Sequence, residues 1–211
     1  QIIKSSKLDK VVLCRRTTLD FDTPFNFGHF FQHIEHSEPN CSIFLYKHSP
    51  TTLFFSVTPE KLYLRQHRQI SIDAIAGTRS IDKNISFSEE LLSSPKDHKE
   101  HELVIDSILS GLKSLTTDIH ITYKHQLLKL AKVQHLKTLL RGTLSDECSD
   151  FDLISKLQPT AAVGGSPREL AIQTIQNIES FNRGVYSGIG GLISPEFSLL
   201  LVLIRTCLVD A

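Results

Sequence analysis

At 211 residues and 40% hydrophobic content, the chain is long enough to bury the core of one large globular domain. Its 23 basic residues balance 23 acidic ones, so net charge gives no argument for nucleic acid or a membrane surface as partner. The longest uncharged apolar run, residues 197–204, is far shorter than the roughly 20 residues that cross a bilayer. We expect a soluble protein without a membrane segment.

The four cysteines are scattered and form no C-x-x-C pair, which favours a reducing cytoplasm over a disulfide framework. The sequence begins at Gln1, contains no methionine and shows no signal segment, so we expect its start to be a cut.

The first half of the chain predicts mainly strands. A short strand over residues 10–13 carries Lys10 at its start, and the aromatic segment 23–35 indicates a short helix. Four β-rich runs then predict an antiparallel meander, over residues 41–46, 52–57, 61–65 and 69–75.

The second half mixes helices and strands. Ser94 and Pro95 predict the N-cap and first turn of an amphipathic helix. Residues 119–144 fit either periodicity, and we favour strands on both sides of His135. Further helices are expected over residues 151–157 and after a capping box at residues 166–169, followed by a last, buried strand over residues 197–204. The simplest account is one α+β domain over residues 1–211.

No phosphate loop, zinc-protease motif or nucleophile elbow occurs in the sequence. Several charged residues instead stand in apolar surroundings, among them Lys10, Glu60, His135 and Arg205, the last within the apolar strand. Because buried charges are costly unless they are paired, their number suggests a functional site.

Asp97, Glu100 and His101 lie at i, i+3 and i+4, on one face of the predicted helix near its N-terminus. This face could hold a hard cation, and carboxylates without a cysteine suit Mg²⁺ better than zinc. Alternatively, Asp97 caps the helix, Glu100 favours its positive end and His101 is solvated. Spacing alone leaves both interpretations open.

Eight short segments, in order, resemble the chorismate-utilising family, which includes isochorismate, salicylate, anthranilate and aminodeoxychorismate synthases. They read LDKVVLCRR, TPEKL, AIAGTR, KDHKEH, VQHLKT, LQPTAAVGGSPR, FNRGVYSG and LIRTCL. The resemblance implies antiparallel β-sheets stacked with outer helices, the fold of anthranilate synthase component I, and chorismate as the small-molecule substrate.

The resemblance also implies an acid–base pair. Lys10 matches the general base that activates water for attack on C2 of chorismate, which requires its neutral amine form. Glu60 matches the general acid that protonates the departing C4 hydroxyl, and for this its pKa has to be raised. Glu100 matches a Mg²⁺ ligand and Asp97 an outer or second carboxylate. No redox or covalent cofactor is expected.

Other matched positions are expected to contact the substrate. Gly77 and Thr78 match a loop close to the ring, and His135 a polar contact near the leaving hydroxyl. By the same resemblance, Ala162 and Val163 form the apolar wall of the site. Tyr186 and Arg205 match contacts to the side-chain carboxylate of the substrate.

Within the family, Lys10 favours water over ammonia as nucleophile, and Ala76 stands where aminodeoxychorismate synthases carry a lysine. We therefore expect an isochorismate synthase of menaquinone or siderophore type, acting as a monomer without a glutaminase partner. Salicylate synthase is the closest alternative, ahead of an enzyme like anthranilate synthase component I. Gln158 stands where a histidine is common. The resemblance also implies that the chain is a fragment with an incomplete fold, because the family's glycine-rich segment and acidic helix are expected beyond Ala211. A truncated, non-catalytic remnant is therefore a further alternative.

Overall fold

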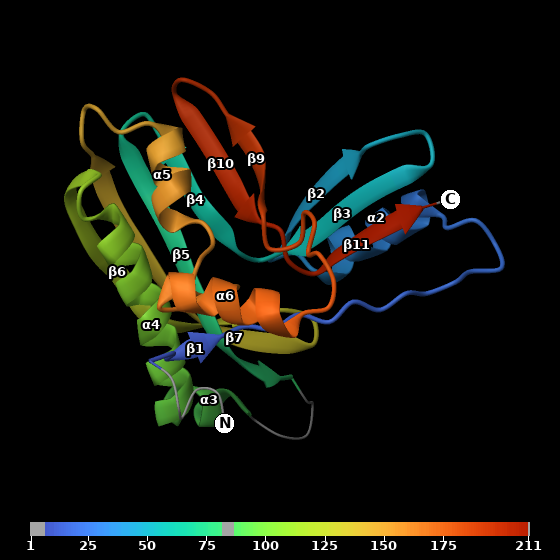
Figure 1. Ribbon diagram of the computed structural model, residues 1–211, viewed down its shortest axis with the longest axis horizontal. Coiled ribbons are helices and arrows are strands. Elements are labelled where there is room, and N and C mark those ends of the chain that lie inside the picture. The colour runs from blue at the N-terminus through green and yellow to red at the C-terminus, as the bar shows by residue number, and fades with distance from the viewer. Residues whose placement is uncertain (1–6, 82–86, 211) are drawn as a thin grey trace.

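The computed structural model describes residues 7–81 and 87–210, in which two larger antiparallel sheets diverge from each other and helices pack outside them (Figure 1). The predicted α+β class with antiparallel sheets and outer helices is confirmed. That residues 1–211 form one domain stays a prediction.

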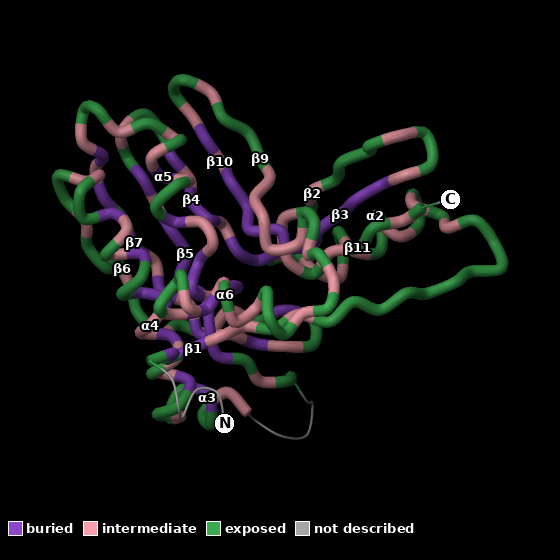
Figure 2. The backbone as a smooth tube through the Cα atoms, viewed as in Figure 1, coloured by how far each residue is buried: buried purple, intermediate pink, exposed green. Residues whose placement is uncertain are grey.

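The larger sheet has six strands in the order β6, β7, β5, β4, β10, β9. Their bounds, in that order, are Thr116–Lys129, Val133–Leu144, Gln69–Ser80, Lys61–Gln66, Phe197–Val202 and Ile189–Ile193. Figure 2 shows that buried positions run along β4, β5 and β10, whereas the hairpin tips are exposed.

Two helices complete the core of this sheet. From α4 (Pro95–Leu112) and α5 (Asp150–Leu157), apolar side chains such as Ile105 and Leu153 join residues of β4, β5 and β7 in one buried cluster. Ser94 caps α4 as predicted, because its side chain accepts a hydrogen bond from the Asp97 amide. A helix that the sequence did not predict, α3 (Phe87–Ser93), precedes α4.

The smaller sheet has three strands in the order β11 (Thr206–Asp210), β3 (Thr52–Thr58), β2 (Ser42–Lys47). Helix α2 (Phe27–Ser37) lies against it, with the rings of Phe30 and Phe31 centred 5.0 and 5.7 Å from that of Phe55. The predicted aromatic helix therefore exists, although it begins four residues later than expected.

A two-residue ladder connects the start of the chain to its second half. Lys10 and Val11 form β1 (Lys10–Val11), which pairs antiparallel with β8 (Gly165–Ser166). Helix α6 (Arg168–Ile178) follows β8 directly and contacts both strands. The expected strand over residues 10–13 is thus confirmed at its first two residues.

The predicted four-strand meander is wrong at its centre. Strands β2 and β3 pair with each other, and β4 pairs with β5, but β3 and β4 belong to different sheets. Pro59 lies between them and has no amide hydrogen to donate to a ladder. The chain therefore leaves one sheet and enters the other at Pro59 and Glu60.

Three further details differ from the sequence prediction. The strand interpretation of residues 119–144 is confirmed, but His135 lies inside β7 and not between strands. The expected capping box at residues 166–169 is absent, because the N-cap of α6 is Pro167, without a side-chain hydrogen bond, and Ser166 belongs to β8. Arg205 is exposed in the turn between β10 and β11, with φ at 52°, rather than within a strand.

Within the described ranges, we find no helix that is both long enough and apolar enough to cross a membrane.

Candidate active site

Lys10 is held in a buried position by the β1–β8 ladder. It pairs with Ser166 in register, and only 8% of its surface is exposed. Its Nζ lies 3.2 Å from Oε1 of Glu100 on α4. The structure thus joins two residues that the sequence singled out and that are far apart along the chain.

Glu60 is buried at the point where the chain crosses between the sheets, with 4% of its surface exposed. The hydroxyl of Thr160 donates a hydrogen bond to its Oε1 at 3.3 Å. Burial raises the pKa of Glu60 to about 7, whereas the Thr160 bond and the charge of Lys10 lower it and the charge of Asp73 raises it. Lys10 and Glu60, the predicted base and acid, are thus both buried, and the charge of Lys10 acts on the pKa of Glu60.

The three ionisable residues that the sequence singled out on α4, Asp97, Glu100 and His101, each have a different partner. Asp97 is buried, and both of its oxygens accept hydrogen bonds from Arg79, at 3.3 and 2.7 Å. Glu100 is about one-third exposed and contacts Lys10. His101 is fully buried, bonded through Nε2 to the Thr138 hydroxyl at 2.8 Å, and burial lowers its pKa to about 4. The expectation that His101 is solvated is wrong, because this imidazole points into the core.

A Mg²⁺ ion would find one suitable carboxylate on this helix. Glu100 keeps part of its surface open to solvent, and Mg²⁺ is commonly held by one or two carboxylates together with water and substrate oxygens. Asp97 fits less well, because Arg79 already occupies both of its oxygens. In the described part of the chain, no group of three or more His, Cys, Asp or Glu residues could hold a metal. The expectation for both carboxylates stays a prediction, and the geometry favours Glu100.

Gly77, Thr78, His135 and Arg205 form one connected group. A bulge in β5 places Gly77 at φ +74° and sets Thr78 opposite His135 on β7. His135 Nδ1 lies 3.0 Å from the Thr78 hydroxyl and 3.3 Å from the Gly77 carbonyl oxygen, and Arg205 Nη2 lies 2.9 Å from His135 Nε2. A guanidinium can only donate, so Nε2 accepts and the ring is neutral. Burial, followed by the charge of Arg205, lowers the pKa of His135 accordingly.

The remaining predicted residues lie on the segments after α5. Val163 is buried and Ala162 packs against the core cluster, as an apolar wall would. Tyr186 is partly buried, with its ring 5.6 Å from the guanidinium carbon of Arg183. Burial is the main cause of the raised pKa of Tyr186, and the charge of Glu60 contributes to it.

Two residues of this region escaped the sequence prediction, although both lie in segments that the family resemblance includes. Thr160 bonds to Glu60 across one hundred positions, and Arg79 holds Asp97. The sequence shows the hydroxyl of Thr160 in the segment LQPTAAVGGSPR and the guanidinium of Arg79 at the end of AIAGTR, and both could have been named as polar candidates. Only the folded chain shows which carboxylates they contact.

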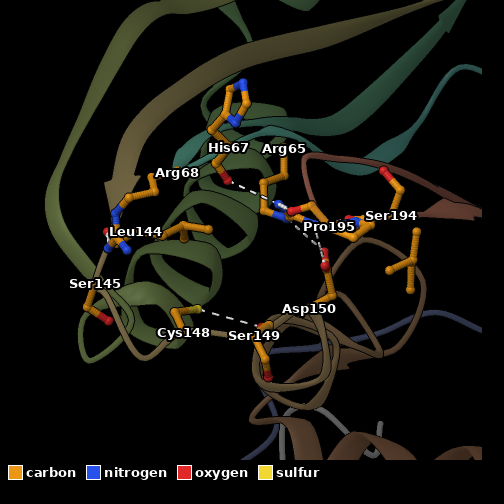
Figure 3. Close-up of a pocket in the computed structure, with 11 residues that line it drawn as sticks. Arg65, His67, Arg68, Leu144, Ser145, Cys148, Ser149, Asp150, Ser194 and Pro195 are labelled. Atoms are coloured by element: carbon orange, nitrogen blue, oxygen red, sulfur yellow. Dashed lines mark hydrogen bonds and ion pairs between the residues drawn. The ribbon is translucent and has the colours of Figure 1, made fainter.

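The surface hollows in the described part of the chain include the following two. One, between α2 and the turn from β6 to β7, is bounded by Arg205. The other, in Figure 3, lies among Arg65, Arg68, Cys148 and Asp150, away from every predicted site residue. There Arg65 donates to both oxygens of Asp150, to three carbonyl oxygens and to the Ser198 hydroxyl. Its donors are used within the protein, so we interpret Arg65 as a structural residue that joins neighbouring loops.

Comparison with known proteins shows which family the chain belongs to. The chain matches the family described as chorismate binding enzyme over residues 1–211. The isochorismate synthase MenF of Haemophilus influenzae is 31% identical over 212 residues, which cover 99% of this chain and 49% of that protein. This chain belongs to the chorismate-binding enzyme family, as its sequence motifs predicted.

Solved structures show the same fold. The menaquinone-specific isochorismate synthase MenF of Escherichia coli matches with a TM-score of 0.90 at 31% identity, over 98% of this chain and 49% of that chain. Anthranilate synthase component I of Streptococcus pneumoniae matches with a TM-score of 0.78 at 23% identity, over 89% of this chain and 42% of that one. The chain thus spans about half the length of the relatives it matches.

Proposed function

We propose that this chain binds chorismate and contributes the acid–base pair of an isochorismate synthase. One observation carries the proposal: Lys10 and Glu60, which come from distant parts of the chain, are both buried, and the charge of Lys10 lowers the pKa of Glu60. Similarity to proteins named isochorismate synthases supports the choice of reaction.

In the proposed reaction, the two groups act on opposite faces of the substrate ring. Lys10, once its ammonium group has lost a proton, takes a proton from water as the water oxygen attacks C2. Glu60 gives its proton to the C4 hydroxyl, which leaves as water while the ring double bonds shift. With a pKa of about 7, Glu60 is protonated in a large fraction of molecules near neutral pH. Water is the nucleophile, so no glutaminase partner is needed.

Neighbouring residues would hold the substrate in this orientation. Arg205 offers a guanidinium fork to a carboxylate of the substrate. Its contact with His135 holds the imidazole ring beside Thr78. Mg²⁺ held through Glu100 would neutralise the C1 carboxylate of chorismate. Val163 is buried and would give the substrate ring an apolar surface to pack against.

The direct test is incubation of the protein with chorismate and Mg²⁺, followed by separation of the products. Isochorismate is the expected product, and a chelator is expected to suppress it. Lys10→Ala and Glu60→Gln should fold and lose at least about 100-fold in turnover, as removed acid–base groups do. Lys7→Ala, an exposed lysine near the same strand, is the matched control and should change little.

Other products would identify the alternatives. Release of pyruvate, detected with lactate dehydrogenase, would identify a salicylate-forming enzyme. Chorismate that is bound but left unconverted would favour the non-catalytic remnant. If chorismate is neither bound nor converted, or if the Lys10 or Glu60 variant retains full turnover, the proposal is wrong.

A further inference from the structure

Arg183 lies in the loop between α6 and β9 and binds groups from three separate segments. Its Nε and Nη2 donate to both oxygens of Glu179, at 2.8 and 2.5 Å. Nη2 also donates to the Val12 carbonyl oxygen at 2.7 Å, and Nη1 to the Val163 carbonyl oxygen at 3.1 Å. The side chains of Arg183 and Glu179 are only 15% and 4% exposed. The guanidinium fork is thus occupied on every side by groups of this chain.

Each of these segments carries a residue of the candidate active site. Val12 follows Lys10 by two positions, and Val163 belongs to the apolar wall. The ring of Tyr186 lies 5.6 Å from the Arg183 guanidinium carbon. One arginine therefore connects the strand of the proposed base, the wall and the tyrosine.

Glu179 strengthens the same connection from the other side. Besides binding Arg183, its Oε1 accepts a hydrogen bond from the Cys14 amide at 2.8 Å. The Arg183–Glu179 pair thus holds the strand that carries Lys10 at two points beyond the ladder, Val12 and Cys14. Charge-assisted, bidentate bonds of this kind are the strong ones in proteins.

The strand needs such support because its own ladder is short. Strand β1 contains two residues, flanked by backbone bonds from Asp9 to Ser166 and from Val12 to Gly164. After Cys14 the chain is mostly exposed and has no helix or strand up to α2. A two-residue ladder next to such a segment opens easily unless other bonds hold it.

We propose that Arg183, together with Glu179, is a positioning residue that fixes the Lys10 strand against the Val163 wall and Tyr186. The catalytic meaning of this position rests on the proposed function. The position of the Lys10 strand does not depend on the proposed function, and it can be measured without substrate.

The intact, folded protein is treated with an amine-reactive reagent. The rate at which Lys10 becomes labelled is then measured by mass spectrometry of the peptides. Arg183→Gln removes the fork and should raise the Lys10 labelling rate at least about tenfold, because local opening becomes easier. Lys137, a partly buried lysine on β7, is the internal reference and should keep its rate.

Arg65→Gln is the matched control, since Arg65 is also a buried arginine that binds a carboxylate and main-chain carbonyl groups. It should leave the Lys10 rate within about twofold of wild type. If Arg183→Gln does not fold, Arg183→Lys, which keeps the charge but loses the fork, replaces it in the same comparison.

Unchanged Lys10 labelling in the Arg183 variant would overturn the inference. An equal rise in the Arg65 variant would overturn it as well, because the effect would then be general destabilisation. Failure of the proposed function has a different signature: the wild-type protein would not bind or convert chorismate, whatever the labelling rates.

Discussion

At Glu60, burial and charge act in opposite directions on one carboxyl group. Burial raises its pKa to about 7, although the Thr160 hydroxyl and the charge of Lys10 both favour the ionised form. Desolvation therefore outweighs two stabilising contacts, as expected for a carboxyl group that is almost fully enclosed. This balance keeps the carboxyl group protonated in a large fraction of molecules near neutral pH, as the proposed role of proton donor requires.

This balance has a consequence for stability. A carboxyl group with a folded-state pKa above its unfolded value stabilises the fold below about pH 4.5, and this contribution is lost as pH rises through about 7. The shift corresponds to on the order of 3 kcal/mol, at about 1.4 kcal/mol per pKa unit. We predict that Glu60→Gln unfolds in urea like wild type near pH 4 and is the more stable protein near pH 8. Parallel pH profiles would contradict this, and the exposed Glu169→Gln is the control.

At the scale of elements, strand β1 depends on a close approach of two backbones. Gly165 adopts φ +141°, and a Cβ there would collide with the Lys10 carbonyl oxygen and approach the Ala171 Cβ to 2.9 Å. Backbone atoms cannot move aside as the end of a flexible side chain can. Only glycine allows β8 to lie this close to the strand that carries Lys10.

We predict that Gly165→Ala separates β1 from β8 and costs roughly 2 to 4 kcal/mol in unfolding free energy. Gly184→Ala is the matched control, because Gly184 also has a positive φ, +57°, but a Cβ there meets nothing within 4 Å. It should cost only about 1 kcal/mol. Hydrogen exchange of the Val12 amide, which bonds to Gly164, should rise only in the Gly165 variant; equal effects of both substitutions would contradict the account.

Elements with local signals were predictable from the sequence. The N-cap of α4 depends on Ser94 and its immediate neighbours. Strands β6 and β7 confirm the favoured interpretation of residues 119–144, although their apolar pattern also fits a helix. Strand partners were not predictable in this way, because the chain changes sheets at Pro59 and Glu60, and no periodicity records the change. The cap of α6 failed for a related reason: Ser166 is used in the β8 ladder.

At the scale of the whole molecule, the site exists only when distant segments meet. Lys10 comes from β1, Glu60 from the crossing between the sheets, and Glu100 from α4. The motifs indicated which residues to examine, and the structure shows their contacts. That Glu100 pairs with Lys10, and Arg79 with Asp97, depends on tertiary packing, so spacing along α4 could not decide between a metal ligand and an ion-pair partner.

The most direct test of the central claim is an experimental structure of the protein with chorismate bound. We predict that the ring lies between the Lys10 amine and the Glu60 carboxyl group, with C2 facing the amine, C4 facing the carboxyl group and a substrate carboxylate at Arg205. Chorismate bound elsewhere, such as in the hollow beside Arg65 and Arg68, or with both reacting carbons out of reach of these two groups, would contradict the account.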